Sequence, residues 1–119
     1  MNRAMKRLSE RRVRRFIEPG EEVVAGVHGH RSWVTMMLPD AVHPFFGRSA
    51  VVTNKKIYLV GPAGRTLIAS WPKGEGQASS TWWTLTLGGG QQKMWLGGGF
   101  VRRGQAREVV RESNTPPAS

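Results

Sequence analysis

Positively charged side chains are the residues of this chain whose number and spacing best suit a chemical role. The 119 residues include 18 Lys and Arg against 8 Asp and Glu, a formal net charge of +10. Such an excess favours polyanions, namely nucleic acid, anionic lipid head groups or acidic proteins. Residues 1–15 hold seven of the cations and one carboxylate, so the N-terminal segment is the most basic part. We expect nine cations to contact an anionic ligand: Arg7, Arg11, Arg14, Arg15, Arg31, Arg48, Lys55, Lys56 and Lys73.

The residues that could carry catalysis or bind a metal form no recognisable motif. The chain has no Cys, which excludes disulfides and thiolate metal sites. Its three His and eight carboxylates show no pattern that joins a nucleophile to a base. His28 and His30 share one strand face, but only His43 remains as a further His, so surface histidines are favoured over a zinc site. We therefore expect no enzyme activity, no metal and no cofactor.

Two glycine triplets, at 88–90 and 97–99, invite comparison with phosphate-binding loops. Neither has the GxxxxGK[ST] spacing or sits in a βαβ unit. Hairpin turns and connections between elements explain these glycines better.

Residues 2–17 show the spacing of an amphipathic helix that Pro19-Gly20 ends. Its apolar residues fall on one face: Met5, Leu8, Val13, Phe16 and Ile17. Arg residues cover the opposite face. Such a helix either lies on an anionic surface or caps a sheet while its Arg face is solvated.

Residues 49–60 predict the central hairpin of an antiparallel sheet, with Asn54-Lys55-Lys56 as its turn. Further strands are predicted at 21–31, 65–71, 81–87 and 91–96, and a second helix at about 101–112. We expect a buried core that includes Val52, Ile57, Leu59, Leu67, Leu85, Trp95 and Val109. The five Trp residues suit core contacts, with base stacking as the alternative.

The segment 32–48 is rich in apolar residues but is interrupted by Pro39, Asp40 and Pro44. It is either a short helix or strand folded onto the core, or an apolar loop that meets a bilayer or a partner. The second interpretation makes candidate contact residues of Trp33, Met36, Met37, Phe45 and Phe46.

Two stretches carry a resemblance to a known family. Residues 19–23 read PGEEV before the first strand, and residues 51–59 read VVTNKKIYL in the centre. The second is similar to the "VvTnrRlyl" segment of small bacterial pleckstrin-homology (PH) and GRAM-like domains. The resemblance implies a mainly β, α+β fold: a bent antiparallel PH-like sheet or barrel capped by a C-terminal helix. The Arg-rich helix (1–17) precedes this domain (18–112), and a flexible tail (113–119) follows it.

The resemblance implies a non-catalytic module that binds an anionic lipid surface or a protein partner. The family's K-x(n)-[KR]-x-R inositol-phosphate pattern is absent between Arg31 and Arg48, so phosphoinositide specificity is not implied. A nucleic-acid binder that uses the Arg-rich helix, and a structural or assembly subunit, are the alternatives. The oligomeric state stays open. With no signal peptide and no apolar run of transmembrane length, we expect a cytoplasmic protein, peripheral to the inner membrane face if it meets a membrane.

Overall fold

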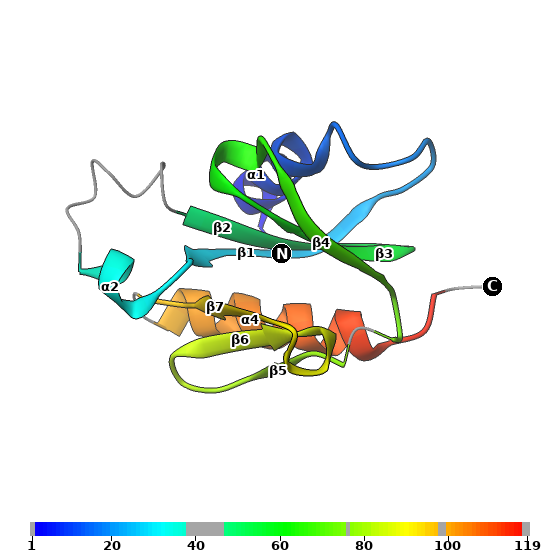
Figure 1. The fold of residues 1–119 in the computed structure, drawn as a ribbon. Helices are drawn as coiled ribbons and strands as arrows, with labels where there is room; N and C mark the ends of the chain where they lie inside the picture. The colour runs from blue at the N-terminus through cyan, green and yellow to red at the C-terminus, as the bar shows by residue number, and fades with distance from the viewer. Residues whose placement is uncertain (1, 38–46, 76, 98–99, 118–119) are drawn as a thin grey trace.

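An open antiparallel sheet forms the centre of the protein, with helices on both of its faces (Figure 1). The computed structural model describes residues 2–37, 47–75, 77–97 and 100–117, and the side chains of all of these except Thr35 and Met36. The strands lie in the order β4-β3-β2-β1-β7-β6-β5. In chain order the elements are α1 (Arg3–Val13), β1 (Val23–His30), α2 (Trp33–Met36), β2 (Gly47–Thr53), β3 (Lys56–Val60), β4 (Leu67–Pro72), β5 (Ser79–Ser80), β6 (Thr84–Leu87), β7 (Gln92–Trp95) and α4 (Phe100–Asn114).

The strands β1, β2 and β3 are buried on both faces, which explains their nearly continuous apolar sequences. In β3, Ile57 and Leu59 belong to one hydrophobic cluster, while Tyr58 and Val60 belong to a second cluster on the opposite face. In β1 the register shifts between Val23 and Ala25. This bulge lets Val23 join one cluster while Ala25 joins the other.

The helix α1 covers one face of β1 and β2, as the capping interpretation of residues 2–17 predicts. Ser9 and Val13 are buried against the sheet, and Phe16 and Ile17 add to the same cluster just beyond the helix. The helix itself ends at Val13, four residues earlier than predicted. Gly26 of β1 faces Ser9, and the absence of a side chain there lets the helix approach closely.

The opposite face of β1 and β2 is covered by α4, and residues of β6 and β7 complete the cluster that contains Ile57 and Leu59. Figure 1 shows α4 running along the strands, with β6 and β7 on the side away from α1. The end of α4 is fixed by Asn114, whose side chain exchanges two hydrogen bonds of 2.9 Å with the backbone of Ala78. The helix thus extends two residues into the segment predicted as tail.

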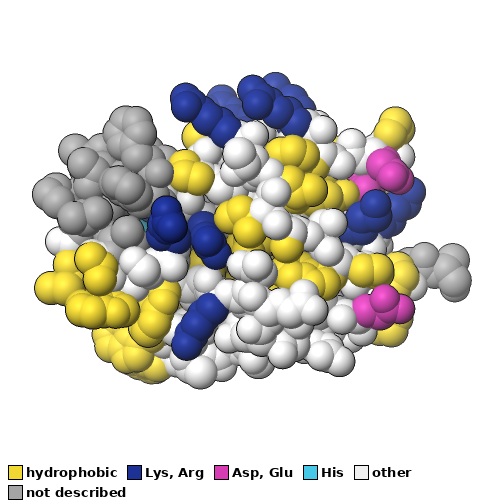
Figure 2. Space-filling model, in the orientation of Figure 1, with side chains coloured by type: hydrophobic (Ala, Val, Ile, Leu, Met, Phe, Trp, Pro, Cys, Tyr) yellow, Lys and Arg dark blue, Asp and Glu magenta, His cyan; other side chains and the backbone are white. Residues whose placement is uncertain are grey.

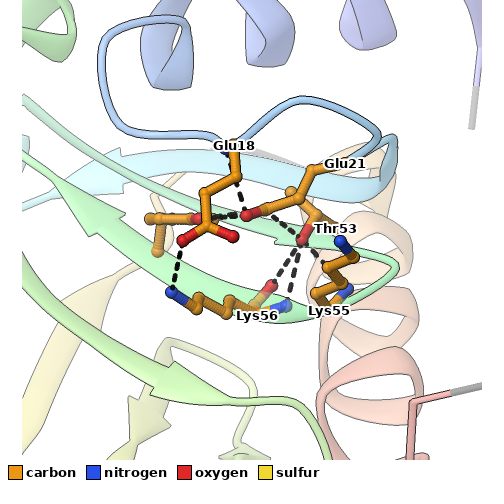
Figure 3. A network of polar contacts seen from close by, with 6 residues as sticks. Glu18, Glu21, Thr53, Lys55 and Lys56 are labelled. Atoms are coloured by element: carbon orange, nitrogen blue, oxygen red, sulfur yellow. Dashed lines mark hydrogen bonds and ion pairs between the residues drawn. The ribbon is translucent and has the colours of Figure 1, made fainter.

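A buried carboxylate joins the two stretches that carry the family resemblance (Figure 3). Glu21 accepts hydrogen bonds from the hydroxyl of Tyr58 at 2.9 Å and from the hydroxyl of Thr53 at 2.8 Å. Asn54 accepts from the backbone N–H of Glu22 at 3.0 Å, and its own N–H donates to the Glu22 carbonyl. These contacts fix the start of β1 to the β2–β3 turn.

Three sequence predictions about packing are wrong. Leu67 lies on the edge strand β4 and is 41% exposed, because no further strand covers that edge. Trp95 is only half-buried. Trp82 and Trp83 precede β6 rather than belonging to it, since Thr81 forms a tight turn in which its backbone N–H donates to the Thr84 carbonyl at 2.8 Å.

The other core predictions are confirmed, since Val52, Ile57, Leu59, Leu85 and Val109 are fully buried. The antiparallel, mainly β architecture with a C-terminal helix is confirmed as well. The sheet is not closed into a barrel: β1 and β7 pair at His30 and Trp95 alone, within the described residues. The turn at 88–90 is confirmed, with Gly88, Gly89 and Gly90 all at positive φ.

The contact between Ser9 and Gly26 leads to a stability prediction. Gly26→Ala places a methyl group against Ser9, so we expect a loss of about 1–3 kcal/mol from overpacking. Gly104→Ala is the matched control, because its added methyl group meets open space on α4 and should stabilise the helix by up to about 1 kcal/mol. Urea unfolding measures both. A smaller loss for Gly26→Ala in a Ser9→Ala background would confirm the contact, and equal stability of the two glycine variants would contradict it.

Tyr58 leads to a prediction about pH. Burial, followed by the hydrogen bond to Glu21, raises the pKa of Tyr58 above its ordinary value. Protonated Tyr58 therefore stabilises the folded state fully below the pKa of about 10 that Tyr58 has in the unfolded chain. This stabilisation is lost as the pH rises through the pKa of Tyr58 in the folded protein. Tyr58 is the one Tyr of the chain, so tyrosinate absorbance reports on it alone. We expect a titration midpoint clearly above 10 in the native protein that returns to about 10 in denaturant; a native midpoint near 10 would contradict the buried contact.

Candidate functional site

The structure divides the predicted anion-binding cations between two ends of the sheet. Arg31 follows β1 and Arg48 lies near the start of β2, at one end. Lys55, Lys56 and Lys73 lie at the β2–β3 turn and beyond the end of β4, at the other end. The length of β2 separates the two ends by roughly 20 Å, at 3.3 Å per residue. These cations therefore do not form one site.

At the end of the sheet where Lys55, Lys56 and Lys73 lie, most of the lysine side chains are engaged in contacts within the protein. Lys56 forms an ion pair with Glu18 at 3.7 Å (Figure 3). Lys73 is only 8% exposed and forms an ion pair with Glu112 at 3.2 Å. Lys55 is exposed on the turn. Two of these three side chains thus contribute to the structure rather than to a free cationic surface.

The predicted arginines of the N-terminal segment are exposed. Arg7 and Arg11 lie on α1, and Arg14 and Arg15 follow it directly. Figure 2 shows Lys and Arg side chains gathered over α1, on the side away from the sheet. The arginines therefore remain accessible to an anionic partner although α1 itself is a structural cover.

The predicted apolar contact residues are described in part. Trp33 and Met37 are exposed at α2, which lies where β1 ends. The side chain of Met36 and both Phe45 and Phe46 lie outside what the structure describes. Val34 is exposed beside Trp33.

A second group of exposed apolar side chains was not predicted as a site. Trp82 and Trp83 lie on the turn before β6, and Phe100 and Val101 begin α4. The rings of Trp82 and Phe100 meet edge to face at a centroid distance of 6.2 Å. A hydrogen bond of 2.7 Å from the backbone N–H of Leu96 to the Trp83 carbonyl places this group where β7 ends. Because β7 ends beside His30 of β1, the second group lies at the same end of the sheet as α2.

We call these residues together the apolar end. Their side chains are between 51% and 79% exposed: Trp33, Val34, Met37, Trp82, Trp83, Phe100 and Val101. Figure 2 shows hydrophobic side chains gathered at the left, where Figure 1 places α2 and the start of α4. A folded protein rarely leaves so many large apolar side chains together in water without a binding role.

Arginines lie among the aromatic rings of the apolar end. The guanidinium carbon of Arg103 lies 3.0 Å from the ring centroid of Trp82, and the Arg103 Nε donates to the Trp82 carbonyl at 3.1 Å. Arg103 and Arg107 line a small polar hollow of about 210 Å³ with Ser80, Thr81 and Trp82. The pKa of Arg103 lies below its ordinary value because of desolvation and the charge of Arg107. An anion in the hollow would offset this repulsion.

A second pair of arginines lies at the same end. The pKa of Arg48 lies below its ordinary value because burial, and then the charge of Arg31, disfavour its charged form. Arg48 also donates to the side-chain carbonyl of Gln92 at 3.4 Å. On the face that Figure 2 shows, Asp and Glu side chains lie at the opposite end of the molecule. The apolar end therefore combines exposed aromatic rings with two pairs of arginines.

The described part of the chain holds neither a metal-binding cluster nor a membrane-spanning helix. No three His, Asp or Glu residues there come together in a way that could hold a metal ion. Among the described helices, none has the length and apolar character needed to cross a membrane.

Comparison with known proteins adds no further assignment. No protein-family model, curated protein or solved structure matches this chain. The candidate site therefore stands on its geometry and on the chemistry of its side chains.

Proposed function

We propose that this chain is a non-catalytic, PH-like binding module that engages an anionic membrane surface through the apolar end. The observation that carries the proposal is the grouping of exposed Trp and Phe rings with Arg103 and Arg107 around one end of the sheet. Trp side chains favour the interface between water and lipid, where a ring meets acyl chains while its N–H stays hydrated. The arginines would face the phosphates of the lipid head groups.

The energies of these contacts suit reversible attachment. Each Lys or Arg near an anionic leaflet contributes about 1 kcal/mol, and the contribution weakens as salt rises. Insertion of exposed apolar side chains adds about 25 cal/mol for each Å² removed from water. Neither contribution alone gives strong binding, so we expect attachment to need both the aromatic rings and the arginines.

The PH-like part of the proposal has support in the fold. A strongly bent antiparallel sheet with a C-terminal helix is the architecture that the family resemblance implies, and the observed strand order and α4 agree with it. The two stretches that carry the resemblance also meet at Glu21 and Thr53. The helix α1 is an addition to that architecture, and its exposed Arg7 and Arg11 extend the cationic surface.

Vesicle co-sedimentation tests the proposal. We expect the protein to bind vesicles of phosphatidylcholine mixed with phosphatidylglycerol at low salt, less at high salt, and poorly to phosphatidylcholine alone. Trp82→Ala combined with Phe100→Ala should weaken binding about tenfold or more, because about 1.4 kcal/mol of apolar insertion is a factor of ten. Leu67→Ala is the apolar control, since Leu67 is exposed on β4, at the sheet edge farthest from β6 and β5.

A second pair of variants isolates the charges. Arg107→Ala should weaken binding to anionic vesicles, whereas Arg111→Ala, one helical turn further along α4, should not. Both variants lose one positive charge, so a general charge effect would lower binding equally. Equal effects of the two, unchanged binding after loss of Trp82 and Phe100, or binding that occurs only to a protein or to RNA would contradict the proposal.

A further inference from the structure

The polar hollow that borders the apolar end has the size of a site for one small group. Its volume is about 210 Å³, below the range of about 300–1,000 Å³ that is typical of sites for drug-sized ligands. It is lined by Ser80 of β5, by Thr81 and Trp82 of the turn before β6, and by Arg103 and Arg107 of α4. Arg107 is exposed, and Ser80 and Arg103 are partly exposed, so a ligand can reach all three from the solvent.

Two guanidinium groups share this hollow without a carboxylate. Arg103 and Arg107 are four residues apart on α4, which places their side chains on the same face of the helix. Desolvation, and then the charge of Arg107, lowers the pKa of Arg103 below its ordinary value, so the two charges are close enough to repel each other. No described Asp or Glu forms an ion pair with either arginine, and none lines the hollow. The hollow therefore favours an anion with more than one negative charge.

Contacts within the protein orient Arg103 and leave the Ser80 hydroxyl available. The guanidinium of Arg103 stacks on the ring of Trp82, and its Nε donates to the Trp82 carbonyl at 3.1 Å. This Nε contact is the one hydrogen bond that Arg103 makes among the described residues, so its two terminal nitrogens can donate to a ligand. The Thr81 hydroxyl accepts from the backbone N–H of Thr84 at 3.2 Å and thus serves the turn. The Ser80 hydroxyl has no hydrogen bond to any described residue and is a further donor for the hollow.

We propose that this hollow binds a phosphomonoester, that is, a phosphate group with a single substituent. Such a group carries about −1.5 to −2 charges at neutral pH and three terminal oxygens. One oxygen can therefore meet each of Arg103, Arg107 and Ser80, and guanidinium groups match phosphate oxygens in geometry. A phosphodiester has one negative charge and two such oxygens, so it leaves one of the three donor groups without a partner.

The inference deepens the proposed function and rests on it, because it names the lipid head group that the apolar end selects. Phosphatidic acid presents a phosphomonoester, whereas phosphatidylglycerol presents a phosphodiester. A soluble phosphomonoester offers the same chemistry to the hollow. The experiment therefore has one arm in solution and one arm on vesicles.

Titration of the full chain with glycerol 3-phosphate, followed by nuclear magnetic resonance at Ser80 and Trp82, tests the site in solution. We expect saturable shifts of both signals. Dimethyl phosphate, a diester, should bind about tenfold more weakly because it lacks the second charge. Arg107→Gln should weaken binding of glycerol 3-phosphate about tenfold or more. Arg111→Gln is the matched control, since it removes the same charge one helical turn further along α4, outside the hollow.

A second pair of variants tests the hydroxyl without changing the charge. Ser80→Ala should weaken binding of glycerol 3-phosphate about fivefold or more, because it removes one hydrogen bond to a charged group. Ser79→Ala is the control, since Ser79 precedes Ser80 on β5 and its side chain points to the other face of the strand. Both side chains are at least partly exposed, so we expect the unfolding midpoint of each variant to equal that of the unchanged protein.

Vesicle co-sedimentation tests the lipid source. Phosphatidylcholine vesicles that contain either phosphatidic acid or phosphatidylglycerol are matched in surface potential through the mole fraction of the anionic lipid. We expect about tenfold tighter binding to the vesicles with phosphatidic acid. Arg107→Gln should abolish this preference, whereas Arg111→Gln should keep it.

The outcomes separate this inference from the proposed function. Equal binding to the two matched vesicles together with no response to glycerol 3-phosphate would overturn the inference, while membrane attachment through Trp82 and Phe100 would stand. Equal affinities for glycerol 3-phosphate and dimethyl phosphate, or equal effects of Arg107→Gln and Arg111→Gln, would also overturn it. Selective binding of glycerol 3-phosphate without attachment to any vesicle would support the phosphomonoester site and contradict the membrane function. A preference for phosphatidic acid that Arg107→Gln abolishes would support both.

Discussion

The buried carboxylate of Glu21 is the contact on which the rest of the structure depends. Its hydrogen bonds to Tyr58 and Thr53 satisfy a charge that would otherwise be costly to bury. They fix the chain between α1 and β1 to the β2–β3 turn, so α1 is directed onto one face of β1, where Val13 completes the cluster around Tyr58. With that face covered, α4 and residues of β6 and β7 cover the other.

Much of this fold can be predicted from the sequence, because alternating apolar residues specify strands and turn-forming residues specify the connections through local interactions. The hairpin at 49–60, the glycine turn at 88–90 and the buried Leu59 and Val109 are all found where the pattern predicts them. The role of Glu21 was not predictable, since its partners Thr53 and Tyr58 are more than thirty residues away in the chain. Local patterns carry no information about such long-range polar contacts.

The candidate site was predicted less well than the fold. Arg31, Arg48, Lys55 and Lys56 were all predicted to contact an anionic ligand, but a sequence does not show which ends of the strands coincide, and the sheet separates the two arginines from the two lysines. Trp82 was assigned to the core because its segment alternates like a strand. The turn that Thr81 forms instead leaves the ring exposed, beside the first residues of α4. The proposed site therefore arises from the tertiary arrangement of segments that are far apart in the chain.

The proposed membrane attachment implies a defined orientation of the protein on the bilayer. The apolar end faces the lipid, and the β2–β3 turn points away from it. Nuclear magnetic resonance with spin-labelled lipid in anionic bicelles tests this orientation most directly, because the label broadens signals from the parts of the protein nearest the bilayer. The account predicts strong broadening for the backbone amides of Trp33, Trp82 and Val101 and none for that of Lys55. Equal broadening at both ends, or broadening confined to the β2–β3 turn, would contradict it.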